Sequence, residues 1–307
     1  MAQNRRMAHT QPGIFAQGTR SHRQLEFSVP GNADIGAIAA GVRSLREPAV
    51  TAGGCNIVIG FGADLWRRVA GHDAPPGLRD FDALDGARHR APSTQRDIWV
   101  WLHGSGPDVV LDTARAVTAA FSPVATLELD QPAFLYLDSR DLTGFVDGTE
   151  NPPVADAPAT VAIPGGPGEG GSFAMTQRYV HDLARFHALP VEQQEAVIGR
   201  SKPDSVELAD AVKPATAHIA RVVIEDEQGD ELEIFRRSTP FGDVEEHGLF
   251  FIAFSVDLQR IDRMLARIFD TAREGTGDRL MDFTTATTGS YWFVPSLDEV
   301  DLRFGED

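Results

Sequence analysis

Apolar residues in the first half of the chain switch between the spacing of strands and the spacing of helices. Short apolar or alternating runs predict four strands, at 25–29, 56–60, 98–102 and 134–137. Apolar residues that recur every three or four positions predict two helices, at 35–45 and 110–121. The expected order is therefore strand, helix, strand, strand, helix, strand.

The second half repeats this order. Its predicted strands lie at 173–180, 231–235, 249–254 and 291–294, and its predicted helices at 191–198 and 261–269. A repeated β-α-β-β-α-β pattern predicts an α+β fold of two tandem ferredoxin-like domains that pack sheet to sheet, as in dimeric α+β barrels. We place the N-terminal domain at 1–129 and the C-terminal domain at 130–307. The segment 152–171 is rich in Pro and Gly, which predicts a loop without regular structure that covers the site.

Composition narrows the classes of partner. The 307 residues carry 28 Lys and Arg against 45 Asp and Glu, a formal net charge of −17. So acidic a surface repels phosphate backbones and anionic lipids, which argues against a nucleic-acid or membrane partner. No apolar run approaches the ~18 residues of a membrane span, and the first residues contain no apolar signal core. We expect a cytoplasmic protein.

Cysteine usage excludes several kinds of site. Cys55 is the only cysteine, so the chain can form no intrachain disulfide, no thiolate metal cage and no C-x-x-C-H attachment of haem. The glycines at 166, 168 and 171 fit G-x-G-x-x-G but lack the strand-turn-helix context of dinucleotide binding. There is neither an H-E-x-x-H zinc motif nor a G-x-S-x-G nucleophile elbow.

The most distinctive segment is 144–152, which reads G-F-V-D-G-T-E-N-P. Asp147-Gly148 is a turn dipeptide, and taken alone it also fits the tip of a surface hairpin. Three more segments follow, K-P-A-T-A-H at 213–218, I-F-R-R-S-T-P-F-G at 234–242 and M-D-F-T-T-A-T-T-G at 281–289. Together and in this order the four segments resemble the dye-decolourising peroxidase family, in its bacterial short-chain branch.

The resemblance implies one non-covalent haem b per chain, in the C-terminal domain. It makes His218 the proximal iron ligand and Asp282 the acid that bonds the second nitrogen of that imidazole. Local sequence leaves other interpretations open. An isolated histidine is often an ordinary half-buried side chain, and Asp282 also fits the cap of a helix or strand.

The resemblance also places two residues on the opposite side of haem. Asp147 is the group that moves a proton between the oxygens of hydrogen peroxide. Arg236 is the cation that binds near the cofactor and stabilises developing charge. The resemblance selects Arg236 over Arg237, because the family's arginine stands four residues before the proline of the P-F-G segment. Adjacent residues of a strand point to opposite faces, so only one of the two is expected to line the pocket. A solvated rim is the alternative for both arginines. Some family members carry Asn where this chain has Ser238, whose hydroxyl orients peroxide with a shorter reach.

The resemblance therefore implies a haem peroxidase that reduces hydrogen peroxide and oxidises small aromatic reductants such as dyes and phenolics in one-electron steps. A homo-oligomer, either a dimer or a hexamer, is expected. Only 296–307 follow the last predicted strand, which argues against packaging in a protein shell. Two alternatives stay open. A non-catalytic haem-trafficking protein would need His218 but not Asp147 or Arg236, and a haem-free α+β module would bind no haem.

Overall fold

The N-terminal half forms the first predicted unit. The computed structural model describes residues 8–45 and 54–305. Its first four long strands are β1 (Ser21–Ser28), β2 (Cys55–Phe61), β5 (Ile98–Gly104) and β6 (Thr126–Phe134). They pair antiparallel in the spatial order β6-β1-β5-β2, and helices α1 (Ile35–Ser44) and α3 (Pro107–Phe121) pack against each other beside them.

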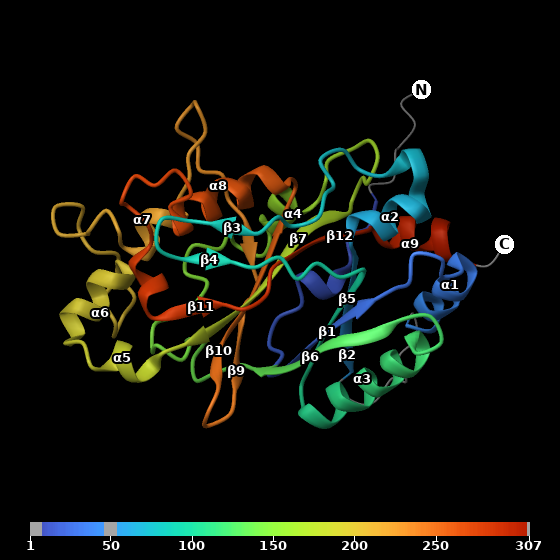
Figure 1. The fold of residues 1–307 in the computed structure, drawn as a ribbon, viewed down its shortest axis with the longest axis horizontal. Coiled ribbons are helices and arrows are strands. Elements are labelled where there is room, and N and C mark those ends of the chain that lie inside the picture. The colour runs from blue at the N-terminus through green and yellow to red at the C-terminus, as the bar shows by residue number, and fades with distance from the viewer. Residues whose placement is uncertain (1–7, 46–53, 306–307) are drawn as a thin grey trace.

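The C-terminal half repeats this topology. Its strands are β7 (Ser172–His181), β8 (Phe235–Arg236), β10 (His247–Ser255) and β12 (Ser290–Val294), in the spatial order β12-β7-β10-β8. Counted within its own half, each set of strands has the order 4-1-3-2, so the prediction of two ferredoxin-like units in an α+β fold is confirmed. The first unit occupies the right of Figure 1 and the second unit the left. Strands β9 (Thr239–Gly242) and β11 (Thr284–Ala286) extend the second sheet by pairing with β10 and β7.

The remaining elements are short, apart from α8 (Leu258–Phe269). They are η1 (Pro12–Ile14), α2 (Ala63–Ala70), η2 (Gly71–Asp73), β3 (Leu84–Asp85), β4 (Arg90–Ala91), α4 (Ala157–Val161), α5 (Leu183–His187), α6 (Val191–Ile198), α7 (His218–Val222), η3 (Arg279–Asp282) and α9 (Leu297–Phe304). Within the described part of the chain, no helix has the length and apolar character needed to cross a bilayer.

Three local predictions are wrong. The predicted strand at 134–137 shares only Phe134 with the sheet, because β6 ends there and a turn begins at residue 137. The segment 152–171 was predicted to lack regular structure, but it contains α4. Pro158 does not prevent this helix, because it lies in the first helical turn, where a missing N–H is tolerated. The predicted strand at 231–235 contributes only Phe235 to the sheet. Its other end bonds back locally, with the Leu232 N–H donating to the Ile224 carbonyl at 2.7 Å.

The two units share one sheet and also pack face to face. A single pairing, Phe61 of β2 with Phe293 of β12, joins the halves into one ten-stranded sheet. Aromatic rings fill the space between the inner faces, with centroids 6.1 Å apart for Trp99 and Trp292 and 6.2 Å apart for Trp101 and Phe254. The predicted sheet-to-sheet packing is thereby confirmed, and the aromatic layer holds the two units in one relative position.

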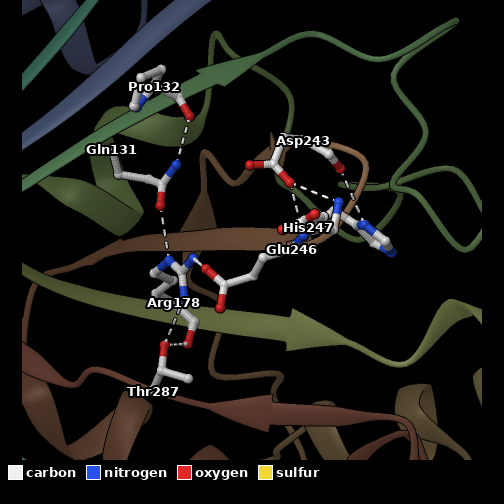
Figure 2. Close-up of polar contacts among 8 residues, drawn as sticks. Gln131, Pro132, Arg178, Asp243, Glu246, His247 and Thr287 are labelled. Atoms are coloured by element: carbon white, nitrogen blue, oxygen red, sulfur yellow. Dashed lines mark hydrogen bonds and ion pairs between the residues drawn. The ribbon is translucent and has the colours of Figure 1, made fainter.

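Arg178 adds a polar link between the units (Figure 2). This β7 side chain donates from Nε to Gln131 Oε1 of β6 at 2.8 Å and pairs with Glu246 beside the β9–β10 hairpin. Its guanidinium lies 4.2 Å from the ring centroid of Phe241. Since β6 pairs with β1 as far as Phe134, residues 130–134 belong to the first sheet, and we place the division between the domains after Phe134 instead of after residue 129.

One acid is trapped between the sheets. Glu26 of β1 is 2% exposed, and it accepts a hydrogen bond from Thr176 Oγ1 of β7 at 3.2 Å. Burial raises the pKa of Glu26 to about 7, against the opposing effects of Thr176 and Arg96. The folded protein therefore retains a proton that the unfolded chain releases near its ordinary pKa. This contribution to stability is present at acidic pH and is lost as the pH rises through about 7.

We predict that Glu26→Gln removes this pH dependence. Between pH 4.5 and pH 8.5 the unfolding free energy of the wild-type protein should fall by on the order of 3 kcal/mol more than that of the variant. Urea denaturation of both proteins across that range measures the difference. A gap between variant and wild type that stays constant with pH would show that Glu26 does not titrate inside the fold.

Candidate functional site

A cavity with a mainly apolar wall lies in the second unit, and we call it the main cavity. It encloses about 1110 Å³ of empty space, part of it open to solvent. Asp147, His218 and Arg236 all line it, so the structure brings together three residues that lie far apart in the sequence. Its apolar wall is formed by Val222, Leu249, Phe251, Ile261, Met264, Leu265 and Ile268.

His218 is held by a carboxylate. It is the first residue of α7, and its Nδ1 lies 2.6 Å from Oδ2 of the buried Asp278. A carboxylate partner keeps the imidazole proton on Nδ1, which leaves the lone pair of Nε2 free to act as a metal ligand. No cluster of three or more His, Cys, Asp or Glu residues suited to a bare metal ion occurs at 8–45 or 54–305.

Asp282 does not occupy the position expected from the sequence. Its carboxylate pairs with Arg88 at 2.7 Å and with His89 at 3.0 Å, away from His218. Asp278 takes that position because it precedes η3 as its N-cap and accepts from the Leu280 N–H at 2.8 Å. Asp278 and Asp282 therefore lie at opposite ends of this short helix. In the sequence, the position of Asp278 as a possible N-cap could have identified it as the partner of His218.

The signature segment folds into a tight loop that presents Asp147. The Asp147 N–H donates to the Ser139 carbonyl at 2.9 Å, and Gly148 takes the positive φ of +80° that a side chain would strain. Among the described residues, none forms a hydrogen bond or an ion pair with the Asp147 carboxylate. Asp147 is therefore a free acceptor at the wall of the main cavity.

Asn151 connects this loop to the strand that carries Arg236. Its Oδ1 accepts from the Arg236 N–H and its Nδ2 donates to the Arg236 carbonyl, both at 2.8 Å. The amide thus bonds to β8 much as a neighbouring strand would, and it fixes the distance between the loop and Arg236. Sequence analysis did not identify Asn151, because the contact spans 85 residues.

The next residue along the strand points elsewhere. The Arg237 guanidinium donates to the backbone carbonyls of Ile14 and Ala16 and lies 5.2 Å from the ring centroid of Trp101. Arg236 lines the main cavity and Arg237 does not. Arg236 is the last residue of β8, so Arg237 lies just beyond the strand.

A second cavity adjoins the main cavity, with about 1250 Å³ of empty space that includes open solvent. Asp147, Gly148 and Arg236 line both cavities. Ser238 lines the second cavity and not the main one, and its Oγ is buried without a hydrogen-bond partner.

Two further charged residues of the main cavity escaped sequence analysis. Arg200 pairs with Glu150, while its Nε is buried and has no partner, and burial lowers its pKa. Burial raises the pKa of Asp141 to about 6, and the nearby charge of Asp147 adds to this rise against the hydrogen bonds of Thr143. The main cavity therefore combines an apolar wall, a histidine donor, a free carboxylate and two arginines.

Comparisons with known proteins identify the family of the chain. The family models for the "Dyp-type peroxidase" N-terminal and C-terminal regions match residues 46–134 and 138–299. A "Dye-decolorizing peroxidase" of Rhodococcus erythropolis is 38% identical over 274 residues, 87% of this chain and 80% of the relative. DyPB from Rhodococcus jostii superposes with a TM-score of 0.90 at 34% identity, over 95% of this chain and 97% of that one. A variant of the same DypB, solved in complex with heme, gives a TM-score of 0.87 at 34% identity, over 93% and 96% of the two chains.

The Asn151 contact yields a test of the site's geometry. We predict that Asn151→Ala speeds amide hydrogen exchange at Arg236 and lowers the unfolding free energy by about 1–3 kcal/mol, because two backbone groups lose their partners. Exchange followed by mass spectrometry and urea denaturation measure these effects. Asn151→Asp is the matched variant, since it keeps the acceptor for the Arg236 N–H but loses the donor, and it should fall between Ala and wild type. Unchanged exchange at Arg236 in the alanine variant would contradict the contact.

Proposed function

The chain belongs to the dye-decolourising peroxidase family, and from that premise we propose that His218, Asp147 and Arg236 carry its chemistry in the main cavity. Members of this family are haem peroxidases, and this chain is a haem peroxidase that reduces hydrogen peroxide and oxidises organic donors. The observation that supports the residue assignment is the meeting of these three side chains, from distant segments, around one apolar-walled space.

The main cavity fits a haem group on the chemistry of its walls. The aliphatic wall suits a porphyrin face, and the Nε2 lone pair of His218 suits the iron. Arg200, whose buried Nε has no partner, would hold a propionate. The Asp278 carboxylate strengthens the His218 donor and favours oxidised iron.

Bound haem supplies the electrons that reduce the O–O bond of peroxide. The side chains on the other wall of the cavity manage protons and charge. With haem bound, the Asp147 carboxylate would accept a proton from one oxygen of hydrogen peroxide and return it to the other, which would leave as water. The Arg236 guanidinium stabilises the negative charge that develops on these oxygens. Asn151 holds Asp147 and Arg236 in register for both tasks.

A non-catalytic haem-trafficking role is less well supported. Such a protein would need the donor at His218 but gains nothing from a carboxylate without partners beside an arginine. Within residues 8–45 and 54–305 the Asp147 carboxylate forms no hydrogen bond or ion pair, and this favours the enzyme, since such a group is available to a substrate.

We also propose a cytoplasmic protein that forms a dimer or a hexamer. A single cysteine suits a reducing compartment. The oligomer rests on the family resemblance alone, and analytical ultracentrifugation of the holoprotein would determine the number of subunits.

Removing either distal group should slow the reaction with peroxide. We predict that Asp147→Asn and Arg236→Leu each lower the second-order rate constant with hydrogen peroxide by about 10²–10⁴-fold while the haem content stays near one per chain. Stopped-flow absorption of the Soret band measures the rate. Asp156→Asn, at an exposed aspartate nearby, is the control and should react as wild type does. Full activity in both distal variants would overturn the assignment of Asp147 and Arg236. Haem uptake without peroxide-driven oxidation, in wild type and in both variants alike, would favour the trafficking role.

The two candidate acids beside the proximal histidine can be separated by redox titration. We predict that Asp278→Asn raises the Fe(III)/Fe(II) reduction potential, because the neutral amide no longer stabilises the oxidised metal. Asp282→Asn should shift the potential less, since its carboxylate pairs with Arg88 and His89. A larger shift in the Asp282 variant would restore the acid first expected from the sequence.

A further inference from the structure

The second cavity carries positive charge in an acidic protein. Among the charged side chains that line it are Arg140, Arg236, Arg237 and Asp147. Arg140 is balanced by Asp138, whose Oδ1 lies 2.9 Å from its Nε. The remaining two arginines face a single carboxylate, although the whole chain has a net charge of −17. An anion is therefore attracted to this cavity more than to the surface around it.

Arg237 lacks a counter-ion. Its guanidinium donates to two backbone carbonyls, and within the described ranges no carboxylate lies within 4.0 Å of it. Burial lowers the pKa of Arg237 to about 10, with no acidic neighbour opposing the change. A desolvated cation without an opposite charge is unfavourable, and a bound anion would relieve that penalty.

Two hydroxyl groups of the same cavity also lack partners. Ser238 Oγ and Thr239 Oγ1 are buried and form no hydrogen bond, and Thr239 is only 5% exposed. Each hydroxyl offers one donor hydrogen, and such groups are normally satisfied in folded proteins. Together with Arg237 they form a run of three adjacent residues that present donors and no competing acid.

The other walls of the second cavity are apolar. Phe235, Leu135 and Pro240 line it, and Val154 and the two prolines before it complete the lining. Val154 is 44% exposed, so the apolar lining extends to the protein surface. An occupant of this cavity should therefore combine an apolar ring with an anionic group.

We propose that the second cavity binds the reducing substrate, and that this substrate is a phenolic donor bearing a carboxylate. Arg237, Ser238 and Thr239 hold the carboxylate, and the apolar wall receives the ring. The inference rests on the proposed function, because a donor here stands next to Asp147 and Arg236, which line both cavities. Two donor molecules each lose one electron and the phenolic proton, and the two electrons and two protons reduce one hydrogen peroxide to two waters.

The test compares two donors that differ only in charge. Holoenzyme oxidises 4-hydroxy-3-methoxybenzoate or its neutral methyl ester, and the ratio of the two kcat/KM values reports recognition of the carboxylate. Arg237→Gln should lower this ratio by about 10–100-fold, because a charge-assisted hydrogen bond is lost. Arg237→Lys should recover part of it. Arg115→Gln removes a charge from an exposed arginine of α3, 77% exposed, and should leave the ratio unchanged.

Thr239→Val keeps the test decisive if Arg237→Gln does not fold. The valine removes a hydroxyl that has no partner, so the fold should be preserved, yet the ratio should fall by about 2–10-fold. An unchanged ratio in Arg237→Gln, or in Thr239→Val when the first variant does not fold, would overturn the proposal.

Failure of the proposed function can be told apart from failure of this inference. Calorimetric titration of wild-type holoprotein with benzoate, which is not consumed, measures binding without turnover. Benzoate should bind wild type at least about tenfold more tightly than it binds Arg237→Gln, or about 2–10-fold more tightly than it binds Thr239→Val if the first variant does not fold. If neither phenolic donor is oxidised while benzoate binding still depends on these residues, the peroxidase assignment fails and the anion site stands. Equal benzoate binding by wild type and variant would exclude the anion site.

Discussion

The hydrogen bond between His218 and Asp278 determines what the main cavity can bind. At 2.6 Å it holds the imidazole proton on Nδ1, so the lone pair on Nε2 is the one available to a metal. The apolar wall then favours a metal carried within a flat organic group over a hydrated ion. Asp147 and Arg236 line the same cavity as that donor, and the catalytic roles that we propose for them depend on a metal held by His218.

The fold supplies this geometry through contacts between distant segments. The aromatic layer around Trp99 and Trp292 fixes the two ferredoxin-like units to each other, and Arg178 ties β6 to the hairpin of the second unit. Within the second unit, the side chain of Asn151 bonds the signature loop to the backbone of Arg236. Arg236 and Arg237 then face different surroundings, one toward the haem cavity and one toward the aromatic layer. A pair of adjacent arginines can thereby take separate roles.

The sequence predicted the parts of the structure that depend on local patterns. Alternation and helical spacing located most strands and helices, because each segment buries one face and its apolar residues show that periodicity. The motif resemblance selected His218, Asp147 and Arg236 as candidate site residues. Asp278 was missed because the choice between two acids depends on which end of η3 faces His218. Asn151 and Arg200 were missed because their roles come from contacts across long stretches of chain. The second cavity exists only through packing and has no motif of its own.

The central claim is that a single imidazole, that of His218, is the protein's ligand to the haem iron. The most direct measurement is the electron paramagnetic resonance spectrum of the ferric His218→Ala protein, recorded with and without added imidazole. The account predicts that the variant loses the histidine-ligated signal of wild type and that free imidazole restores it by entering the vacated space. A variant that keeps the wild-type signal without added imidazole would contradict the account, because the iron would then be held by another residue.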